Sequence, residues 1–137
     1  MAVPTLSRVL LVEDDPDIRA LTGFALRSVG GFELEECASG ADACVRAKLF
    51  RPEIVLLDLM MPGMDGWATL RAMRAMPETA RTPVVFITAK VQTHEVESYR
   101  RSGVSDVIVK PFEPAALPDL LRSIWRRIHG EADREPA

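Results

Sequence analysis

The segment 54–66 constrains the fold of this chain more than any other stretch. An apolar run, Ile-Val-Leu-Leu, leads directly into Asp58, and the chain breakers Pro62, Gly63 and Gly66 follow. A short apolar run that ends at such breakers is typical of a strand buried on both faces of a parallel sheet. Asp58 then lies at the carboxyl end of that strand, where open α/β sheets bind their ligands. Asp58 is therefore a candidate functional residue.

The rest of the chain repeats this alternation of apolar runs and amphipathic segments. Strands are predicted at 8–12, 32–38, 83–87 and 104–109, and helices at 16–29, 41–50, 67–76, 92–102 and 118–128. Because parallel strands need right-handed crossovers, this alternation predicts a doubly wound (βα)5 three-layer α/β sandwich. The polar interruptions at 32–38 indicate a strand at the edge of the sheet.

Length and charge set the remaining expectations. The 137 residues suffice for one domain, which we predict at 8–128, after an N-terminal leader at 1–7 and before a mobile C-terminal tail at 129–137. A net charge of -3 gives no global reason to expect nucleic acid or a membrane as a partner. No signal peptide or membrane-length apolar run is present, so we predict a cytoplasmic protein.

Two further groups of residues have simple interpretations. Cys37 and Cys44 lack metal-ligand spacing, and we interpret them as reduced thiols rather than a redox pair. Arg122, Arg126 and Arg127 could form a basic binding patch, but a solvated helix face explains them better.

Polar side chains follow four of the predicted strands, at edges that a parallel sheet brings together. They are Glu13 and Asp14 after the first strand, Asp58 after the third, Thr88 after the fourth and Lys110 after the fifth. Clustered carboxylates repel one another, and a divalent cation relieves that repulsion. Ligation by oxygen alone favours Mg²⁺. A lysine and a hydroxyl beside the metal can orient a phosphoryl group, and a carboxylate can accept it as an acyl phosphate.

This conjunction resembles the receiver domain of bacterial response regulators, the chemotaxis-regulator-like switch of two-component signalling. The motifs are Val-Leu-Leu-Val-Glu-Asp-Asp at 9–15, Leu-Leu-Asp-Leu-Met-Met-Pro-Gly-Met-Asp-Gly at 56–66, Ile-Thr-Ala at 87–89 and Val-Lys-Pro-Phe at 109–112. The resemblance implies a flavodoxin-like sheet with strand order 2-1-3-4-5. It also implies a cis peptide bond between Lys110 and Pro111.

The resemblance assigns the central chemistry to acidic residues. Asp58 is the implied phosphoacceptor, and its donor is a phosphohistidine of a sensor histidine kinase or a histidine phosphotransfer protein. The implied Mg²⁺ ligands are the carboxylates of Asp14 and Asp58 and the backbone carbonyl of Met60. Glu13 stands where the family often has Asp, and we expect it to act through an outer contact.

The resemblance also implies how the protein binds the phosphoryl group and changes conformation in response. Thr88, Lys110 and the backbone N–H of Ala89 bind its oxygens, and the pull on Thr88 and Lys110 remodels the face made by the 92–102 helix, the 104–109 strand and the last helix. Many receivers have an aromatic residue three positions before the lysine, where this chain has Val107. We expect a smaller aliphatic movement to transmit the signal here.

The leading hypothesis is a stand-alone receiver, a signalling switch and not an enzyme. Its expected partners are the phosphohistidine donor and a downstream protein, with no nucleic acid and no membrane, and it is expected as a monomer or homodimer. One alternative is a non-phosphorylated interaction module, which only Val107 supports. Another is an Mg²⁺-dependent phosphatase with an aspartyl nucleophile, which Met60 disfavours because such enzymes usually have a second Asp at that position.

Overall fold

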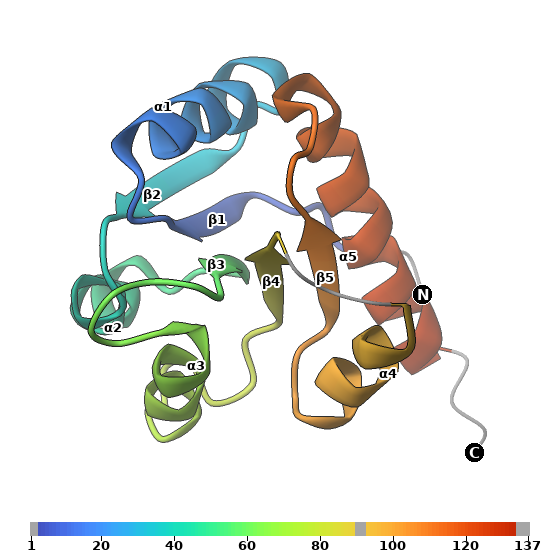
Figure 1. Cartoon of the computed structure of the whole chain (residues 1–137). Helices are drawn as coiled ribbons and strands as arrows, with labels where there is room; N and C mark the ends of the chain where they lie inside the picture. The colour runs from blue at the N-terminus through green and yellow to red at the C-terminus, as the bar shows by residue number, and fades with distance from the viewer. Residues whose placement is uncertain (1–2, 90–92, 134–137) are drawn as a thin grey trace.

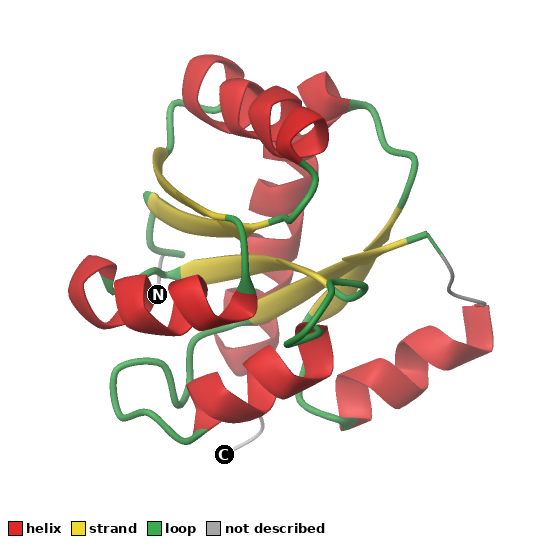
Figure 2. Cartoon of the chain, turned by 60° about the vertical axis from the view of Figure 1, so that its left-hand side comes forward, coloured by secondary structure: helices red, strands yellow, loops and turns green. Residues whose placement is uncertain are grey.

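The apolar runs of the sequence form one parallel sheet between two layers of helices in the computed structural model, which describes residues 3–89 and 93–133 (Figures 1 and 2). The strands are β1 (Arg8–Val12), β2 (Glu33–Cys37), β3 (Ile54–Asp58), β4 (Val84–Thr88) and β5 (Asp106–Val109). They pair in the order β2-β1-β3-β4-β5, as the resemblance implied, and the polar strand β2 lies at one edge.

The helices connect successive strands and cover both faces of the sheet (Figure 1). They are α1 (Pro16–Phe24) with its π-helical continuation η1 (Ala25–Val29), α2 (Gly40–Phe50), α3 (Gly66–Arg74), α4 (Thr93–Arg101), the short 3-10 helix η2 (Pro114–Ala116) and α5 (Leu117–Asp133). The predicted doubly wound sandwich is confirmed.

Two apolar clusters hold the layers together, because successive side chains of a strand point to opposite faces of the sheet. Leu11 and Leu56 belong to a first core cluster, which joins the sheet to η1 and α5. Leu10 and Leu57 belong to a second core cluster, which joins the sheet to α2 and α3. Both faces of β1, β3 and β4 are therefore buried, which explains their continuous apolar sequences.

Three helices begin with a side-chain cap in the loop that follows a strand. Asp15 Oδ1 accepts from the backbone N–H groups of Asp17 and Ile18 at 2.9 and 3.1 Å. Ser39 and Asp65 cap α2 and α3 in the same way, at 3.1 and 2.8 Å. Each cap satisfies backbone donors that have no helical partner. The caps thereby define where α1, α2 and α3 leave the sheet edge.

The ends of the chain differ from their predicted boundaries. The last helix continues beyond Ile128 to Asp133, and the ring of His129 on this extension packs on Trp125 with 4.1 Å between ring centroids. At the other end, Trp125 Nε1 donates to the Pro4 carbonyl at 2.7 Å, so part of the predicted leader packs on α5. Met1 and Ala2, the predicted helix start at Gln92 and the tail at 134–137 lie outside the described residues.

Two boundaries inside the chain also differ. The predicted 16–29 helix changes its winding after Phe24, where the Gly30 N–H donates to the Ala25 carbonyl at 2.9 Å in a π-helical turn. β5 begins at Asp106, two residues later than predicted. Among the described helices, none combines the length and the apolar character needed to cross a membrane.

Candidate functional site

Asp58 is the last residue of the central strand β3, and both of its carboxylate oxygens have partners. Oδ1 accepts from the Met60 backbone N–H at 3.1 Å, and Oδ2 lies 3.5 Å from Lys110 Nζ. The residue is only 3% exposed, although β3 ends here and the chain turns toward α3. A carboxylate so far removed from water is costly unless it is paired.

Lys110 brings the end of β5 to the acidic residues that follow β1. Its Nζ lies 2.9 Å from Glu13 Oε1, and the Glu13 side chain is 1% exposed. The second Glu13 oxygen accepts from the Asp15 backbone N–H at 3.2 Å. The peptide bond between Lys110 and Pro111 is cis, as the resemblance implied. Lys110 therefore bridges two buried carboxylates that belong to different strands.

The charges of this cluster shift the titration of its members. Burial, together with the hydrogen bond and the negative charge of Glu13, raises the pKa of Asp58 from 3.8 to about 7, although Lys110 and the Met60 N–H oppose the shift. Burial by itself lowers the pKa of Lys110, but the hydrogen bond to Glu13 and the charge of Asp58 outweigh burial and raise it. The cluster therefore has more negative charge than its one lysine compensates.

The residues present fit a divalent cation. Glu13, Asp14 and Asp58 each offer a carboxylate oxygen, and these oxygens lie within 4.8 Å of one another in the described part of the chain. A hard cation with oxygen ligands, such as Mg²⁺, would relieve the repulsion that raises the pKa of Asp58. The three acids that the sequence singled out are thus brought together.

The remaining predicted site residues surround this cluster. Thr88 is buried at the carboxyl end of β4, next to β3, where the partner of Asp58 is Ile87. Ala89 follows Thr88 and is exposed. Met60 is 69% exposed at the rim. Val107 lies away from the acids, half-buried and packed against the second core cluster.

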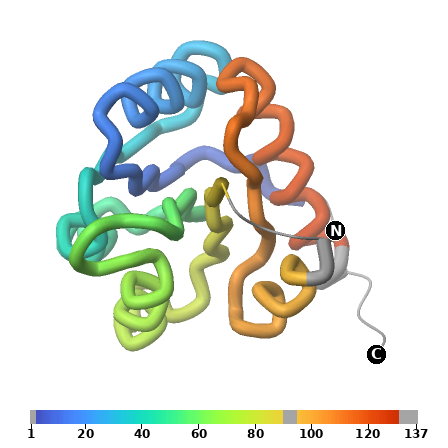
Figure 3. The backbone as a smooth tube through the Cα atoms, viewed as in Figure 1, coloured from blue at the N-terminus to red at the C-terminus, as the bar shows by residue number. Residues whose placement is uncertain are grey.

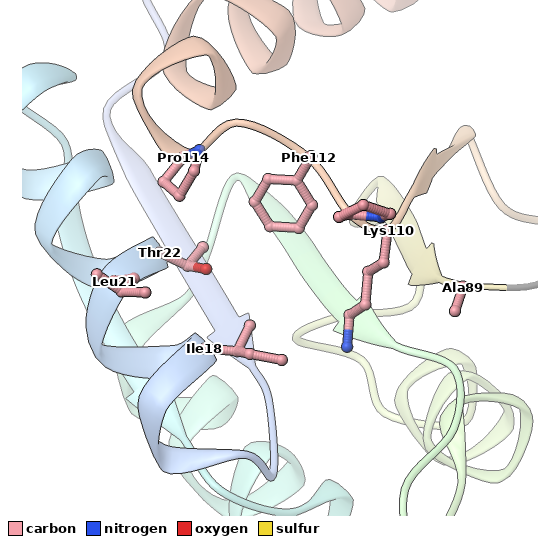
Figure 4. Close-up of a pocket in the computed structure, with 8 residues that line it drawn as sticks. Ile18, Leu21, Thr22, Ala89, Lys110, Phe112 and Pro114 are labelled. Atoms are coloured by element: carbon pink, nitrogen blue, oxygen red, sulfur yellow. The ribbon is translucent and has the colours of Figure 1, made fainter.

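An apolar groove of about 470 Å³ opens on the side of Lys110 that faces α1 (Figure 4). Ile18 and Leu21 of α1 form one wall, and Phe112 after β5 and Pro114 at the start of η2 form the other. The Lys110 side chain extends past this groove, so its ammonium group leaves the apolar lining for the acidic cluster.

The contacts of Arg19 with the acidic loop were not predicted from the sequence. Arg19, on α1, donates through Nη1 to the Glu13 carbonyl at 2.8 Å and reaches the Asp14 carbonyl at 3.5 Å. A signal was present, because a cation near a helix N-terminus opposes the helix dipole and needs a specific partner. Here that partner is the backbone of the acidic loop.

Comparison with known proteins places these motifs in a family context. Residues 9–122 match the family described as the response regulator receiver domain. The fold is similar to the chemotaxis protein CheY4 of Vibrio cholerae, with a TM-score of 0.78, 28% identity and coverage of 88% of this chain and 99% of that one. It is also similar to the receiver domain of sensor histidine kinase PA1611 from Pseudomonas aeruginosa, which has a magnesium ion coordinated in its active site cleft; the TM-score is 0.74, with 30% identity and coverage of 92% and 99%.

Curated relatives that match this chain include proteins named as DNA-binding or transcriptional regulators. The DNA-binding response regulator MtrA of Mycolicibacterium smegmatis is 37% identical over 90% of this chain and 53% of its own length. The phosphate regulon transcriptional regulatory protein PhoB of Rhizobium meliloti is 31% identical over 92% of this chain and 55% of its own length. The chain thus spans about half the length of the curated relatives it matches, and its stand-alone character stays a prediction.

These relatives correct the predicted partners. The exclusion of nucleic acid is wrong, because related response regulators are named as DNA-binding proteins. The exclusion rested on the net charge of 137 residues and on the expectation of a stand-alone receiver, and neither represents proteins about twice as long. In this chain, Arg122 donates to the Gly30 carbonyl and Arg127 donates to Asp106 Oδ2 at 2.9 Å, so both hold α5 to neighbouring elements.

Proposed function

The chain belongs to the family of response regulator receiver domains, and on that premise we propose that it accepts a phosphoryl group on Asp58 from a phosphohistidine. The observation that carries this proposal is the environment of Asp58. Its carboxylate ends the central strand, contacts Lys110 at 3.5 Å and lies among three clustered acids. No other carboxylate in the described residues combines these three properties.

The proposed transfer exchanges a P–N bond of the donor for a P–O bond to Asp58. A carboxylate oxygen of Asp58 attacks the phosphorus of the phosphohistidine, an O–P bond forms and the P–N bond breaks. The electron pair of the broken bond goes to the imidazole nitrogen, which takes up a proton from water. Mg²⁺, when bound by the carboxylates of Asp14 and Asp58 and the Met60 carbonyl, would supply positive charge for the phosphoryl oxygens. Glu13 would assist from an outer position.

Lys110 and Thr88 have a second proposed task once the acyl phosphate exists. Lys110 exchanges part of its contact with Glu13, now 2.9 Å long, for a phosphoryl oxygen. Thr88 and the Ala89 N–H offer further donors at the end of β4. Because these groups move toward the new charge, phosphorylation biases the equilibrium between two conformations of the receiver.

The experiment measures intact mass after incubation with Mg²⁺ and phosphoramidate, a small donor whose P–N bond imitates phosphohistidine. Wild type is expected to gain one phosphoryl group, and Asp58→Asn none. Asp65→Asn is the matched control, because Asp65 caps α3 and asparagine caps equally well. It should be phosphorylated like wild type.

Two results would overturn the proposal. No mass gain under saturating donor would favour a receiver-like interaction module, in which Val107 replaces the usual aromatic residue. Continuous hydrolysis of unrelated phosphate esters would favour an aspartyl phosphatase.

A further inference from the structure

We infer that Arg19 is a positioning residue, whose guanidinium orients the Asp14 carboxylate for Mg²⁺. The inference rests on the proposed function, since it concerns the metal ligands of that site. Arg19 is half-buried on the first turns of α1 and donates to two backbone carbonyls of the loop after β1. It reaches the site only through that backbone, so it is not a catalytic residue.

The two carbonyls that Arg19 contacts belong to the two peptide planes on either side of Asp14. The Glu13 carbonyl, 2.8 Å from Nη1, lies in the peptide that precedes the Asp14 Cα atom. The Asp14 carbonyl, at 3.5 Å, lies in the peptide that follows it. Since those two planes determine the backbone dihedral angles of Asp14, one guanidinium restrains the direction of its side chain.

The Asp14 carboxylate needs such a restraint more than its neighbours do. Glu13 is held by Lys110 at 2.9 Å and by the Asp15 N–H, and Asp58 by the Met60 N–H and Lys110. Within the described ranges 3–89 and 93–133, no hydrogen bond or ion pair holds the half-buried Asp14 carboxylate. The orientation of the Asp14 carboxylate therefore depends on the backbone of Asp14, and Arg19 holds that backbone.

Charge and position predict opposite effects of removing Arg19. A positive guanidinium beside a cation site repels the cation, so electrostatics alone would make Arg19→Met bind Mg²⁺ more tightly. Loss of the backbone restraint would make it bind more weakly, as when a group that orients a metal ligand is removed. The sign of the change in affinity thus separates the two roles.

The test is a calorimetric titration of MgCl₂ into the 137-residue chain, without a phosphoryl donor. Arg19→Met is expected to bind Mg²⁺ ~10-fold more weakly than wild type. Arg19→Lys keeps the charge but lacks the reach and planarity of the guanidinium, so it should also bind more weakly. Arg71→Met, at an exposed position on α3, removes the same charge and should bind like wild type.

A second readout separates positioning from general loss of structure. At limiting Mg²⁺, Arg19→Met should be phosphorylated more slowly than wild type, and added Mg²⁺ should reduce this difference, because excess metal fills the weaker site. Far-UV circular dichroism shows whether the variant folds; where Arg19→Met does not fold, Arg19→Lys carries the test.

Unchanged or tighter Mg²⁺ binding by a folded Arg19→Met, or by Arg19→Lys where only that variant folds, would overturn the inference. Failure of wild type to bind Mg²⁺ would instead overturn the metal site of the proposed function.

Discussion

Two carboxylates at the carboxyl edge of the sheet are buried to almost the same degree as the core clusters beneath them. Asp58 and Glu13 are 3% and 1% exposed, and Leu56 is 0% exposed only two residues before Asp58. Burial of a leucine side chain contributes about 1.5–3 kcal/mol to stability. Burial of Asp58 instead disfavours its charged form and raises its pKa to about 7. The strand β3 thus carries both a leucine that stabilises the fold and a carboxylate whose charge destabilises it.

This difference shows how the site can exist. Asp58 is kept away from water by the same strand, β3, whose leucines join both core clusters. The core holds the carboxylates at separations that they would not adopt by themselves. In the proposed function, the Asp58 carboxylate binds a cation and accepts a phosphoryl group to form an acyl phosphate.

The largest effect is expected in the core. Leu56→Ala should lower the free energy of unfolding by about 2–5 kcal/mol, because it leaves a cavity in the first core cluster. Urea denaturation measures the change. Leu49→Ala, at a position on α2 that is 91% exposed, should change stability by less than about 0.5 kcal/mol. Equal losses at the two positions would show that β3 is not held by the core.

At the carboxyl edge of the sheet, by contrast, a substitution is expected to raise the free energy of unfolding. Asp58→Asn should raise the free energy of unfolding at pH 8, without divalent cations, by on the order of 1–3 kcal/mol. The folded-state pKa of about 7 exceeds the ordinary 3.8, so the protonated carboxyl stabilises the fold at low pH. That contribution is lost as the pH rises through 7, and asparagine avoids the loss.

Thermal melts across a pH series measure this second effect. The advantage of Asp58→Asn over wild type should grow between about pH 4 and pH 7 and then level off. Asp119→Asn, at an exposed acid on α5, should show no such gain. If Asp58→Asn is instead less stable than wild type at pH 8, burial of the charged carboxylate does not destabilise the fold.

Asp15 is an exposed carboxylate at the same edge of the sheet. Asp15 caps α1 through two backbone N–H groups, so Asp15→Ala should lower the free energy of unfolding by about 0.5–2 kcal/mol. Asp15→Asn keeps the acceptor and should lose little. Urea denaturation of both variants measures the difference. A gain in stability for Asp15→Ala would mean that repulsion by Glu13 and Asp14 outweighs the cap.

Much of this arrangement could be predicted from the sequence, because it depends on local patterns. The apolar run before Asp58 and the breakers after it predicted β3 and the site edge, and the acids at Glu13 and Asp14 predicted the cluster. The order of strands came from the resemblance, and the structure confirms it. The phosphoacceptor, metal-binding and switch roles of these residues stay predictions.

The features that were missed depend on contacts between distant segments or on backbone atoms. The ion pair of Glu13 with Lys110 joins residues far apart in sequence, so no local pattern shows it. Arg19 donates to carbonyl oxygens, which every residue carries, so the sequence indicates that Arg19 needs a partner but not which residue supplies it. The contact of His129 with Trp125 lies on the part of α5 that extends beyond the predicted helix end. Such contacts become visible only once the fold is known.

The smallest expected effect concerns a thiol at the same edge that belongs to the core. Cys37 ends β2, its carbonyl accepts from the Glu13 N–H at 3.0 Å, and its side chain lies in the second core cluster. Burial, reinforced by the charge of Asp42, raises the pKa of this thiol to about 12. It therefore remains neutral at pH 8, so its burial, unlike that of Asp58, keeps no charge from water.

The measurement is alkylation of the native protein with iodoacetamide at pH 8, followed by peptide mapping. The half-buried Cys44 should react at least about ten times faster than Cys37, because only an accessible thiolate attacks the reagent. Both thiols should react at similar rates in denaturant. Similar rates in the native protein would mean that the edge opens around β2, and the buried charges beside it would then be relieved by water and not by a bound cation.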